Sequence, residues 1–256
     1  VTVADAREVL AALPPASLDI VVAEPSNPWI AGIADLYTAE SFGRVRERLR
    51  PGGVLVQWIH TYEMADSALH DILCTLHGVL PHIAVFRMDP GDLALVASAI
   101  PLAFDPTAAA VALAEPGVRR QLNGHRSADV PKSLDAFLVA QLAGPATVAR
   151  LCQGFAAPLQ ERFPRLEYSA PRDFFAASSA SAMVQRLDTR FARKPDTWLA
   201  EWGGGGAWPA ERRAQVHAFL AAGRHAEEQP MVAATAPVAS LPVALALAVH
   251  QLPQAD

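Results

Sequence analysis

Cysteine is scarce in this sequence, and its scarcity excludes two kinds of site. Only two cysteines occur among the 256 residues, and both lie among apolar residues at helical spacing. Two cysteines cannot form the disulfide framework of a small secreted domain, and the Cys and His spacing of a zinc site is absent. We therefore expect Cys74 and Cys152 to be buried, reduced thiols, and we expect no bound metal.

Charge is also low, with no excess of positive charge. Charged residues make up 18% of the sequence, and the net charge is −5. This balance argues against a surface that binds nucleic acid or another polyanion. The basic run Arg44, Arg46, Arg48 and Arg50 alternates around a predicted helix, and we interpret it as a solvated face of that helix.

Long uninterrupted apolar runs and a signal-peptide pattern are absent as well. The most apolar late stretch, residues 232–249, contains Pro237 and Pro242 and is short for a bilayer span. The chain begins at Val1, inside a predicted strand and without an initiator methionine. We therefore expect it to be part of a longer polypeptide.

The most informative stretch is a short apolar strand that ends in polar residues. Residues 20–23 are apolar and mostly β-branched, a pattern that predicts a strand buried on both faces, as in a parallel sheet. Pro25 and Pro28 cannot continue the strand, so Glu24 is expected at its carboxyl end. In open α/β sheets, ligands bind outside the carboxyl ends of the strands. The residues expected to meet a ligand there are Glu24, Ser26, Asn27 and Trp29.

Strands and helices alternate over the first hundred residues. This alternation predicts βαβ units and a parallel sheet, and right-handed crossovers would bring Asp5, Glu24 and Gln57 to one rim. The last two strands are close enough in sequence to form an antiparallel hairpin. The predicted strands are 1–3, 19–24, 54–59, 83–86 and 93–97, and the predicted helices are 6–13, a Thr38-capped helix reaching Leu49, and one from Asp66 to about Gly78.

The pattern changes after residue 100, where alanine-rich helical segments follow without clear strands. The expected helices are 108–122, 133–142, 146–153, one carrying Met183, Val184, Leu187 and Phe191, and one from Pro209 through Leu220. Residues 165–172 are predicted to be a short strand or an extended segment. Gly203 to Gly206 is interpreted as a flexible break, because it lacks the preceding strand of a phosphate loop.

The ordered set of motifs resembles the spermidine synthase family, especially the long bacterial spermidine-synthase-like proteins. The residues that carry the likeness are Asp5-Ala6-Arg7, Glu24 to Trp29, Leu36-Tyr37-Thr38, Pro51-Gly52-Gly53 and Gln57-Trp58, with a weaker echo at Leu166 to Arg172. The resemblance implies a methyltransferase-like Rossmann fold whose glycine-rich loop and ribose-binding acid lie upstream of Val1. It also implies a location in the cytoplasm, or in a cytoplasmic domain of a protein with an N-terminal membrane region.

We therefore expect an α/β fold with three regions. Residues 1–100 would be the C-terminal part of a Rossmann-like nucleotide-binding domain, with a partial parallel sheet that ends in an antiparallel hairpin. Residues 101–202 would be a mostly helical extension packed on it. Residues 203–256 would hold the glycine-rich break, one helix and an Ala/Pro-rich tail.

The resemblance implies transfer of an aminopropyl group from decarboxylated S-adenosylmethionine to an amine such as putrescine, with release of methylthioadenosine. By motif position, Asp5 and Ala6 would bind the adenine, and Glu24 would activate the amine. Asn27 stands where the family has a second aspartate, and Gln57 matches a glutamine near the amine. Two aspartates are thus replaced, and the tyrosine expected between the last strands is missing from residues 87–92.

Each candidate residue also has a structural interpretation. Asp5 suits a helix N-cap, Asn27-Pro28 suits a turn, and Glu24 suits acceptance of backbone N–H groups. Trp29 and Tyr37 would either wall a channel for the substrate's methylene groups or pack against the sheet. His60 would be either a proton carrier near the substrate or a structural histidine.

Two further functions remain open. Ser26-Asn27-Pro28-Trp29 faintly resembles the Asn-Pro-Pro-Tyr loop of nitrogen methyltransferases, which use S-adenosylmethionine. The replacement of the family's two aspartates by Glu24 and Asn27 instead favours a non-catalytic ligand-sensing or assembly module that keeps the fold. Because the nucleotide loop is expected upstream of Val1, residues 1–256 are expected to be inactive alone. The resemblance also allows a homodimer.

Overall fold

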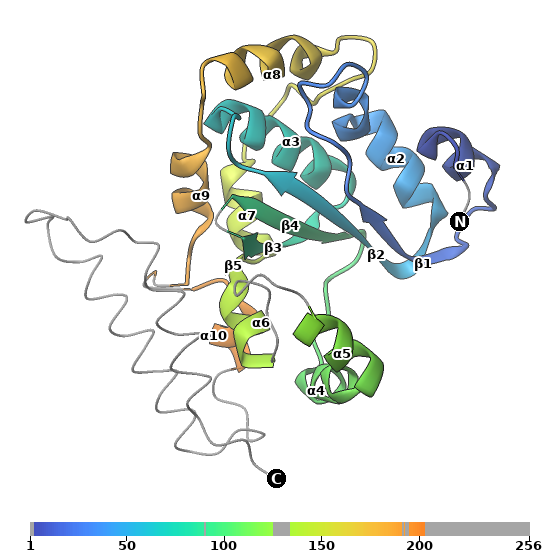
Figure 1. Cartoon of the computed structure of the whole chain (residues 1–256), viewed down its shortest axis with the longest axis vertical. Helices are drawn as coiled ribbons and strands as arrows, with labels where there is room; N and C mark the ends of the chain where they lie inside the picture. The colour runs from blue at the N-terminus through green and yellow to red at the C-terminus, as the bar shows by residue number, and fades with distance from the viewer. Residues whose placement is uncertain (1–2, 90, 125–133, 191, 193–194, 203–256) are drawn as a thin grey trace, which may run out of the picture. The chain divides into compact units, whose positions relative to one another are not determined.

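The computed structural model describes residues 3–89, 91–124, 134–190, 192 and 195–202 (Figure 1). The chain divides into two compact units. The first comprises Val1–Phe86, Gly91–Ala103 and Ala143–Leu187, and the second comprises Arg87–Pro90, Phe104–Leu142 and Asp188–Asp256. Several predictions fall outside the described residues: those for Val1, Thr2, Phe191, the glycine-rich break, the helix from Pro209 and the Ala/Pro-rich tail.

Five strands form one mixed sheet in the order β1-β2-β4-β3-β5. β1 and β2 are parallel, and β2 and β4 are antiparallel. The expected α/β class is confirmed. The sheet starts with a parallel pair, and β3 and β4, which are neighbours in it, are joined by a two-residue connection. The strands are β1 (Leu18–Ala23), β2 (Leu49–His60), β3 (His82–Asp89), β4 (Asp92–Ser98) and β5 (Gln141–Ala143).

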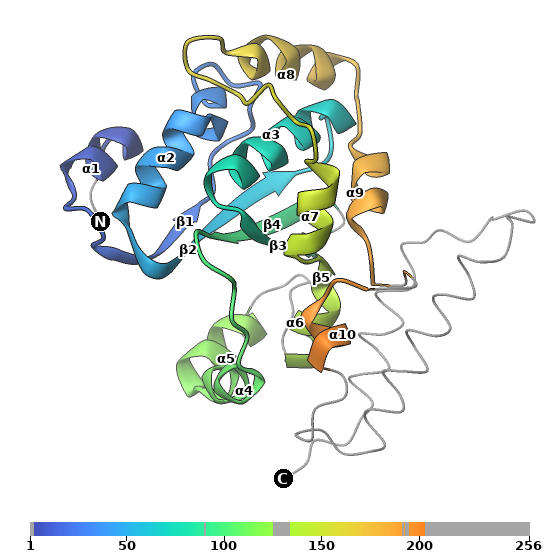
Figure 2. The ribbon, with the colours of Figure 1, turned by 180° about the vertical axis from the view of Figure 1, so that it is seen from behind.

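The helices of the first unit include three that lie together on one side of the sheet, α1, α2 and α3 (Figures 1 and 2). This unit contains α1 (Ala6–Ala12), the 3-10 helix η1 (Ala34–Tyr37), α2 (Ala39–Arg48), α3 (Asp66–Val79), α7 (Pro145–Leu151), α8 (Arg165–Phe175) and α9 (Ser181–Leu187). The second unit contains α4 (Pro106–Ala114), α5 (Pro116–Gly124), α6 (Leu134–Ala140) and α10 (Trp198–Trp202). Among the described helices, none has the length and apolar character needed to cross a bilayer.

The core of the first unit lies between this helical layer and the sheet. Alternate residues of β2, Leu55, Gln57 and Ile59, are buried on the helix-facing side. The inward face of α3 is Leu69, Ile72, Leu73 and Leu76, as the helical spacing predicted. Burial of each of these leucine and isoleucine side chains contributes about 1.5–3 kcal/mol to the stability of the folded state. Thr38 caps α2 as predicted, because its hydroxyl accepts a hydrogen bond from the Ser41 amide.

The prediction that β1 is buried on both faces is wrong. Ile20 is 60% exposed and Val22 is 62% exposed. Their partners in the register, Val54 and Val56, are only half-buried. The reason is positional: β1 is an edge strand, and α1, α2 and α3 all lie on the other side of the sheet.

Three other predictions of local structure are also wrong. Residues 165–172 belong to helix α8 rather than to an extended segment, because Leu166 and Ala170 are buried together four residues apart. The helical segment predicted to end at Leu142 ends at Ala140, and strand β5 follows it. The second strand starts at Leu49, so Pro51-Gly52-Gly53 lies inside β2 instead of before it.

The basic run is partly solvated, as predicted, because Arg46 and Arg50 are exposed, but three of its four arginines also have a partner. Arg44 forms a bidentate ion pair with Glu161, and Arg50 donates to both carboxylate oxygens of Asp19. The Arg48 guanidinium donates to the Leu10 carbonyl at 2.7 Å. Arg46 is exposed. These cations therefore stabilise the first unit, and a free basic face is not formed.

The second unit has its own small core. Leu138 and Leu199 are buried, and Phe104 and Trp198 pack against them. The Phe104 and Trp198 rings are stacked with centroids 4.8 Å apart. In the same unit, Arg190 pairs with Asp188 and donates to the Val139 carbonyl. Apolar and aromatic packing therefore holds α6 and α10 together, and the buried Arg190 ties its own segment to α6.

The prediction of reduced thiols is wrong, because Cys74 and Cys152 form a disulfide. Packing of α3 against α7 brings the two Cα atoms to 5.2 Å, which is within the range that a disulfide spans. The bond joins α3 to the residue that follows α7, across a sequence separation of 78 residues. Sequence spacing alone could not predict this pairing, because it depends on the packing of two distant helices.

Removal of the disulfide is expected to destabilise the protein. Replacing both residues (Cys74→Ala with Cys152→Ala) should lower the free energy of unfolding in urea by about 2–4 kcal/mol, because the unfolded chain regains the freedom of a long loop. The natural chain with dithiothreitol should unfold at nearly the same urea concentration as the variant. Two free thiols in the unreduced, denatured protein would contradict the pairing.

Candidate functional site

The ends of β1 and β2 meet at the carboxyl rim of the sheet. Ala23, the last residue of β1, pairs with Gln57 of β2 in parallel register. Glu24 follows directly and is exposed, and β2 continues to His60. The chain therefore brings Glu24 next to the last residues of β2, as the crossover argument predicted.

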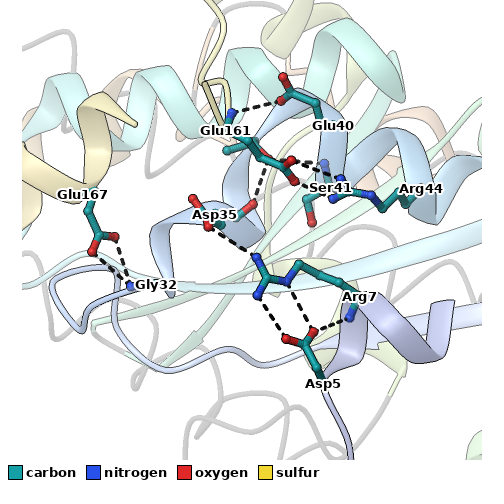
Figure 3. A network of polar contacts seen from close by, with 10 residues as sticks. Asp5, Arg7, Gly32, Asp35, Glu40, Ser41, Arg44, Glu161 and Glu167 are labelled. Carbon is teal, nitrogen blue, oxygen red and sulfur yellow. Dashed lines mark hydrogen bonds and ion pairs between the residues drawn. The ribbon is translucent and has the colours of Figure 1, made fainter. Parts of the chain in front are cut away.

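A network of charges ties Asp5 to the loop that follows β1 (Figure 3). Asp5 caps α1 by accepting the Arg7 amide at 2.8 Å, and the Arg7 guanidinium bridges Asp5 at 3.0 Å and Asp35 at 3.3 Å. These hydrogen bonds from Arg7 hold the pKa of the Asp5 carboxyl below its usual range. The N-cap interpretation of Asp5 is confirmed. Adenine binding by Asp5 and Ala6, the first residue of α1, stays a prediction.

Helix α8 and the segment before it are held by contacts with the loop after β1, with α2 and with the residue that precedes α3. The Glu167 carboxylate accepts the Gly32 amide at 3.0 Å, and Glu161 pairs with Arg44 of α2 (Figure 3). The Asp173 carboxylate accepts the Ala65 amide at 3.0 Å, just before α3 begins. These contacts were not predicted, because residues 165–172 were expected to be extended. The spacing of Leu166 and Ala170, four residues apart, is the pattern in the sequence that indicates a helix here.

Aromatic rings surround His60 at the end of β2. The ring centroid of His60 lies 4.8 Å from that of Trp29, 4.9 Å from Tyr62 and 5.7 Å from Trp58. Phe174 of α8 extends the group, with its centroid 5.0 Å from Trp29. We call Trp29, Trp58, His60, Tyr62 and Phe174 the His60 cluster. Sequence analysis proposed Trp29 and His60 as substrate-binding, and it missed Phe174.

His60 is buried without a hydrogen-bond partner. Its side chain is 0% exposed, and among the described residues neither ring nitrogen has a partner. Burial lowers the pKa of His60 to about 4, so the imidazole is neutral at pH 7. Buried polar atoms are nearly always paired, because an unmade hydrogen bond costs about 1–3 kcal/mol. Both ring nitrogens of His60 are therefore unsatisfied among the described residues of this rim.

Tyr62 covers His60 and is itself held in place by its backbone neighbours. Its ring lies so close to Gly91 that a Cβ atom there would be 2.8 Å from Tyr62 Cδ1. Thr61 donates its amide to the Gly91 carbonyl at 2.7 Å and accepts the Ala180 amide at 2.9 Å. Tyr62 is nevertheless 45% exposed, so solvent reaches the outer side of the cluster.

Three other predicted site residues are occupied by packing or turn contacts. Tyr37 is fully buried, burial raises its pKa, and its hydroxyl has no partner among the described residues. The Gln57 amide nitrogen donates to the Trp58 carbonyl at 2.9 Å and to the Ala23 carbonyl at 3.4 Å. The Asn27 carbonyl accepts the Ile30 amide at 3.0 Å, which confirms a turn. Ligand contact by these residues stays a prediction.

The rim is packed rather than open. Gln57, His60 and Tyr37 are all buried, while Glu24 and Tyr62 reach solvent. A hollow of about 240 Å³ lies instead at the other end of β2, where Leu49, Arg50 and Gly53 help to line it. Across the described residues, no group of three or more His, Cys, Asp or Glu side chains could hold a metal ion.

Comparison with known proteins finds a likeness at the level of structure. No protein-family model and no curated protein matches the chain. A probable spermidine synthase from Corynebacterium glutamicum ATCC 13032 is similar over 61% of this chain, with 24% identity and a TM-score of 0.40. The match covers 52% of that protein, so this chain spans about half of its length. No activity follows from a likeness of this size.

The pKa of His60 predicts a specific loss of stability in acid. Unfolded His60 takes up a proton near its ordinary pKa of 6.5, but the folded protein resists protonation until about pH 4. Between these values the unfolded state binds more protons, so stability falls as the pH is lowered. The natural protein should therefore lose roughly 3 kcal/mol more than His60→Phe over this interval.

Urea unfolding at pH 7.5, 6.5, 5.5 and 4.5 measures this difference. Above pH 7 the two stability curves should run parallel, because His60 is neutral in both states there. Curves that stay parallel down to pH 4.5 would show that His60 is not buried as described.

Proposed function

We propose that the protein carrying this chain transfers an aminopropyl group from decarboxylated S-adenosylmethionine to an amine such as putrescine. The supporting observation is the exposed Glu24 carboxylate at the end of β1, next to the end of β2 and its His60 cluster. A carboxylate beside aromatic walls suits an amine with an apolar chain. The motif order from Asp5 to Trp58 supports the same assignment.

The reaction needs an uncharged amine nitrogen in line with a carbon bound to the sulfonium sulfur. The nitrogen forms a bond to this carbon, the carbon–sulfur bond breaks, and its electron pair stays on sulfur in methylthioadenosine. The new ammonium then loses a proton. Glu24 would accept that proton, and Trp29 would hold the alkyl chain in position. Positioning of this kind supplies much of the acceleration in such transfers.

The proposed nucleotide contacts involve Asp5 and Ala6 at the start of α1. The Asp5 carboxylate already receives the Arg7 amide and guanidinium, so an adenine amino group would share an acceptor whose charge is compensated. Carboxylate oxygens have several lone pairs, and this sharing is chemically acceptable. Arg7 would then hold Asp5 in one orientation for the nucleotide.

The packed rim favours one other function, a ligand-sensing or assembly module. Buried Gln57 and Tyr37 leave little room for two substrates without movement of the cluster. Such a module would bind a nucleotide or an amine and would release no product. A third outcome is nitrogen methylation, whose product from S-adenosylmethionine is S-adenosylhomocysteine.

Glu24→Gln is expected to lower turnover by about 10²–10⁴-fold, because general-base assistance contributes an amount of this order. The protein is incubated with decarboxylated S-adenosylmethionine and putrescine, and methylthioadenosine is measured by mass spectrometry. Glu8→Gln, an exposed acid in α1, is the matched control and should keep full activity. S-adenosylhomocysteine formed from S-adenosylmethionine would identify a methyltransferase. Binding of a ligand without formation of either product would indicate a non-catalytic ligand-sensing or assembly module.

A further inference from the structure

We propose that the solvent-facing side of α8 is a docking surface for an anionic lipid bilayer. In the bound state α8 lies in the plane of the bilayer, with its aromatic rings among the lipid headgroups and its arginines on the lipid phosphates. This surface does not depend on the proposed function. We call it the α8 outer face, and its members are Arg162, Phe163, Arg165, Tyr168, Arg172 and Phe175.

The first argument is the spacing of the exposed residues along α8. Tyr168, Arg172 and Phe175 are four and three residues apart, so they lie on one side of the helix. A different side carries Leu166 and Ala170, which are buried, and α8 contacts α3 and η1. The helix is therefore anchored to the first unit on one side and presents rings and guanidinium groups to solvent on the other.

The second argument is the exposure of three aromatic rings. Phe175 is 86% exposed, Tyr168 is 69% exposed and Phe163 is 64% exposed. Exposed apolar side chains that gather in one place mark an interaction site, whereas single ones need no explanation. The Phe175 ring also packs edge-on against Phe174, with centroids 5.3 Å apart, so its inner side is supported. Protruding aromatic rings are typical of helices that lie at a lipid interface.

The third argument is that the acids of this segment turn toward the protein. The Glu161 carboxylate pairs with an arginine of α2. The carboxylates of Glu167 and Asp173 accept backbone amides of two other segments. Hydrogen bonds to a charged acceptor are among the stronger ones in proteins, so these three acids are held in place. Their negative charge is therefore drawn away from the α8 outer face.

The arginines of the same segment remain on the exposed side. Arg162 lies over the Phe163 ring, 5.6 Å from its centroid, and Arg172 donates to the Tyr168 carbonyl at 3.2 Å. Across the described residues, neither arginine forms an ion pair with an acid. Arg165 does pair with an acid of α3. The net charge of the whole chain is negative, but this face carries two uncompensated cations and complements an anionic surface.

A lipid surface fits these observations better than two other occupants. A second copy bound through the same face would bring like-charged arginines together, which costs free energy. A folded protein partner would need an acidic groove shaped to the helix. The headgroup region of a bilayer accepts rings and cations without a fixed shape, and anionic lipids supply the opposite charge.

Cosedimentation with lipid vesicles tests the proposal on the natural chain. One set of vesicles contains phosphatidylcholine alone, and the other contains equal amounts of phosphatidylcholine and phosphatidylglycerol. The natural chain should bind the anionic vesicles roughly 25-fold more tightly, because each arginine near an anionic surface contributes about fivefold and two are uncompensated. Molar sodium chloride should remove most of this preference, since salt screens exposed charges.

Two variants separate the contributions of charge and ring. Arg172→Glu should weaken binding to the anionic vesicles by about fivefold or more, through loss of one cation and gain of one acid. Phe175→Ser should weaken it by about tenfold, because burial of a phenylalanine ring in an apolar environment contributes at least that much. The matched controls are Arg46→Glu, at an exposed arginine of α2, and Val111→Ser, at an exposed position of α4, and both should bind normally.

Several results would overturn the lipid surface. Equal binding to the two kinds of vesicle would remove the role of charge, and natural binding by both Arg172→Glu and Phe175→Ser would exclude this face. Absence of vesicle binding, with self-association of the natural chain that Phe175→Ser abolishes in sedimentation velocity, would identify a second copy as the occupant instead. Should a variant not fold, hydrogen exchange of the natural chain decides. Anionic vesicles should slow exchange of the amides in residues 162–175, and unchanged exchange there would overturn the proposal.

Discussion

Parallel pairing of β1 with β2 is the constraint on which the site depends. The register joins Ala23 to Gln57, and it thereby decides which residues follow each strand at the rim. A shift by one residue would turn every side chain of β1 to the other face and move Glu24 away from the end of β2. The alternation within β1 opposes such a shift, because the half-buried Val21 and Ala23 would then exchange faces with the exposed Ile20 and Val22.

Contacts between distant segments determine how closed this rim is. The chain from Ala143 to Leu187 belongs to the first unit, where the disulfide, the Glu161–Arg44 pair and the Glu167–Gly32 hydrogen bond hold it. Three carboxylates, those of Glu167, Asp173 and Asp66, accept hydrogen bonds from backbone amides of other segments. Charge-assisted bonds of this kind are among the stronger ones in proteins. α8 is thus held where Phe174 can pack on Trp29.

Local patterns predicted the elements whose buried face is set within one segment. The spacing of Leu69, Ile72 and Leu76 predicted α3, and Thr38 predicted the start of α2. The features that sequence analysis missed depend on partners far along the chain. Burial of β1 depends on what covers the sheet, and the disulfide depends on how α3 meets α7. For the site, the crossover argument predicted that Glu24 and Gln57 lie at one rim, but it did not predict that Gln57 and Tyr37 are buried.

Under the proposed function, the charge at this rim has a physical consequence. Glu24 is an exposed acid and Asn27 is a neutral amide. These two residues would attract a dication less strongly from a distance than two acids would, since Coulomb attraction scales with charge. Recognition of an amine would then depend more on contacts that act at short range, such as contacts with the faces of aromatic rings. Short-range contacts discriminate by shape and length, because a ligand that does not reach them gains nothing from them. Such a rim would attract amines weakly but would distinguish between amines of different length.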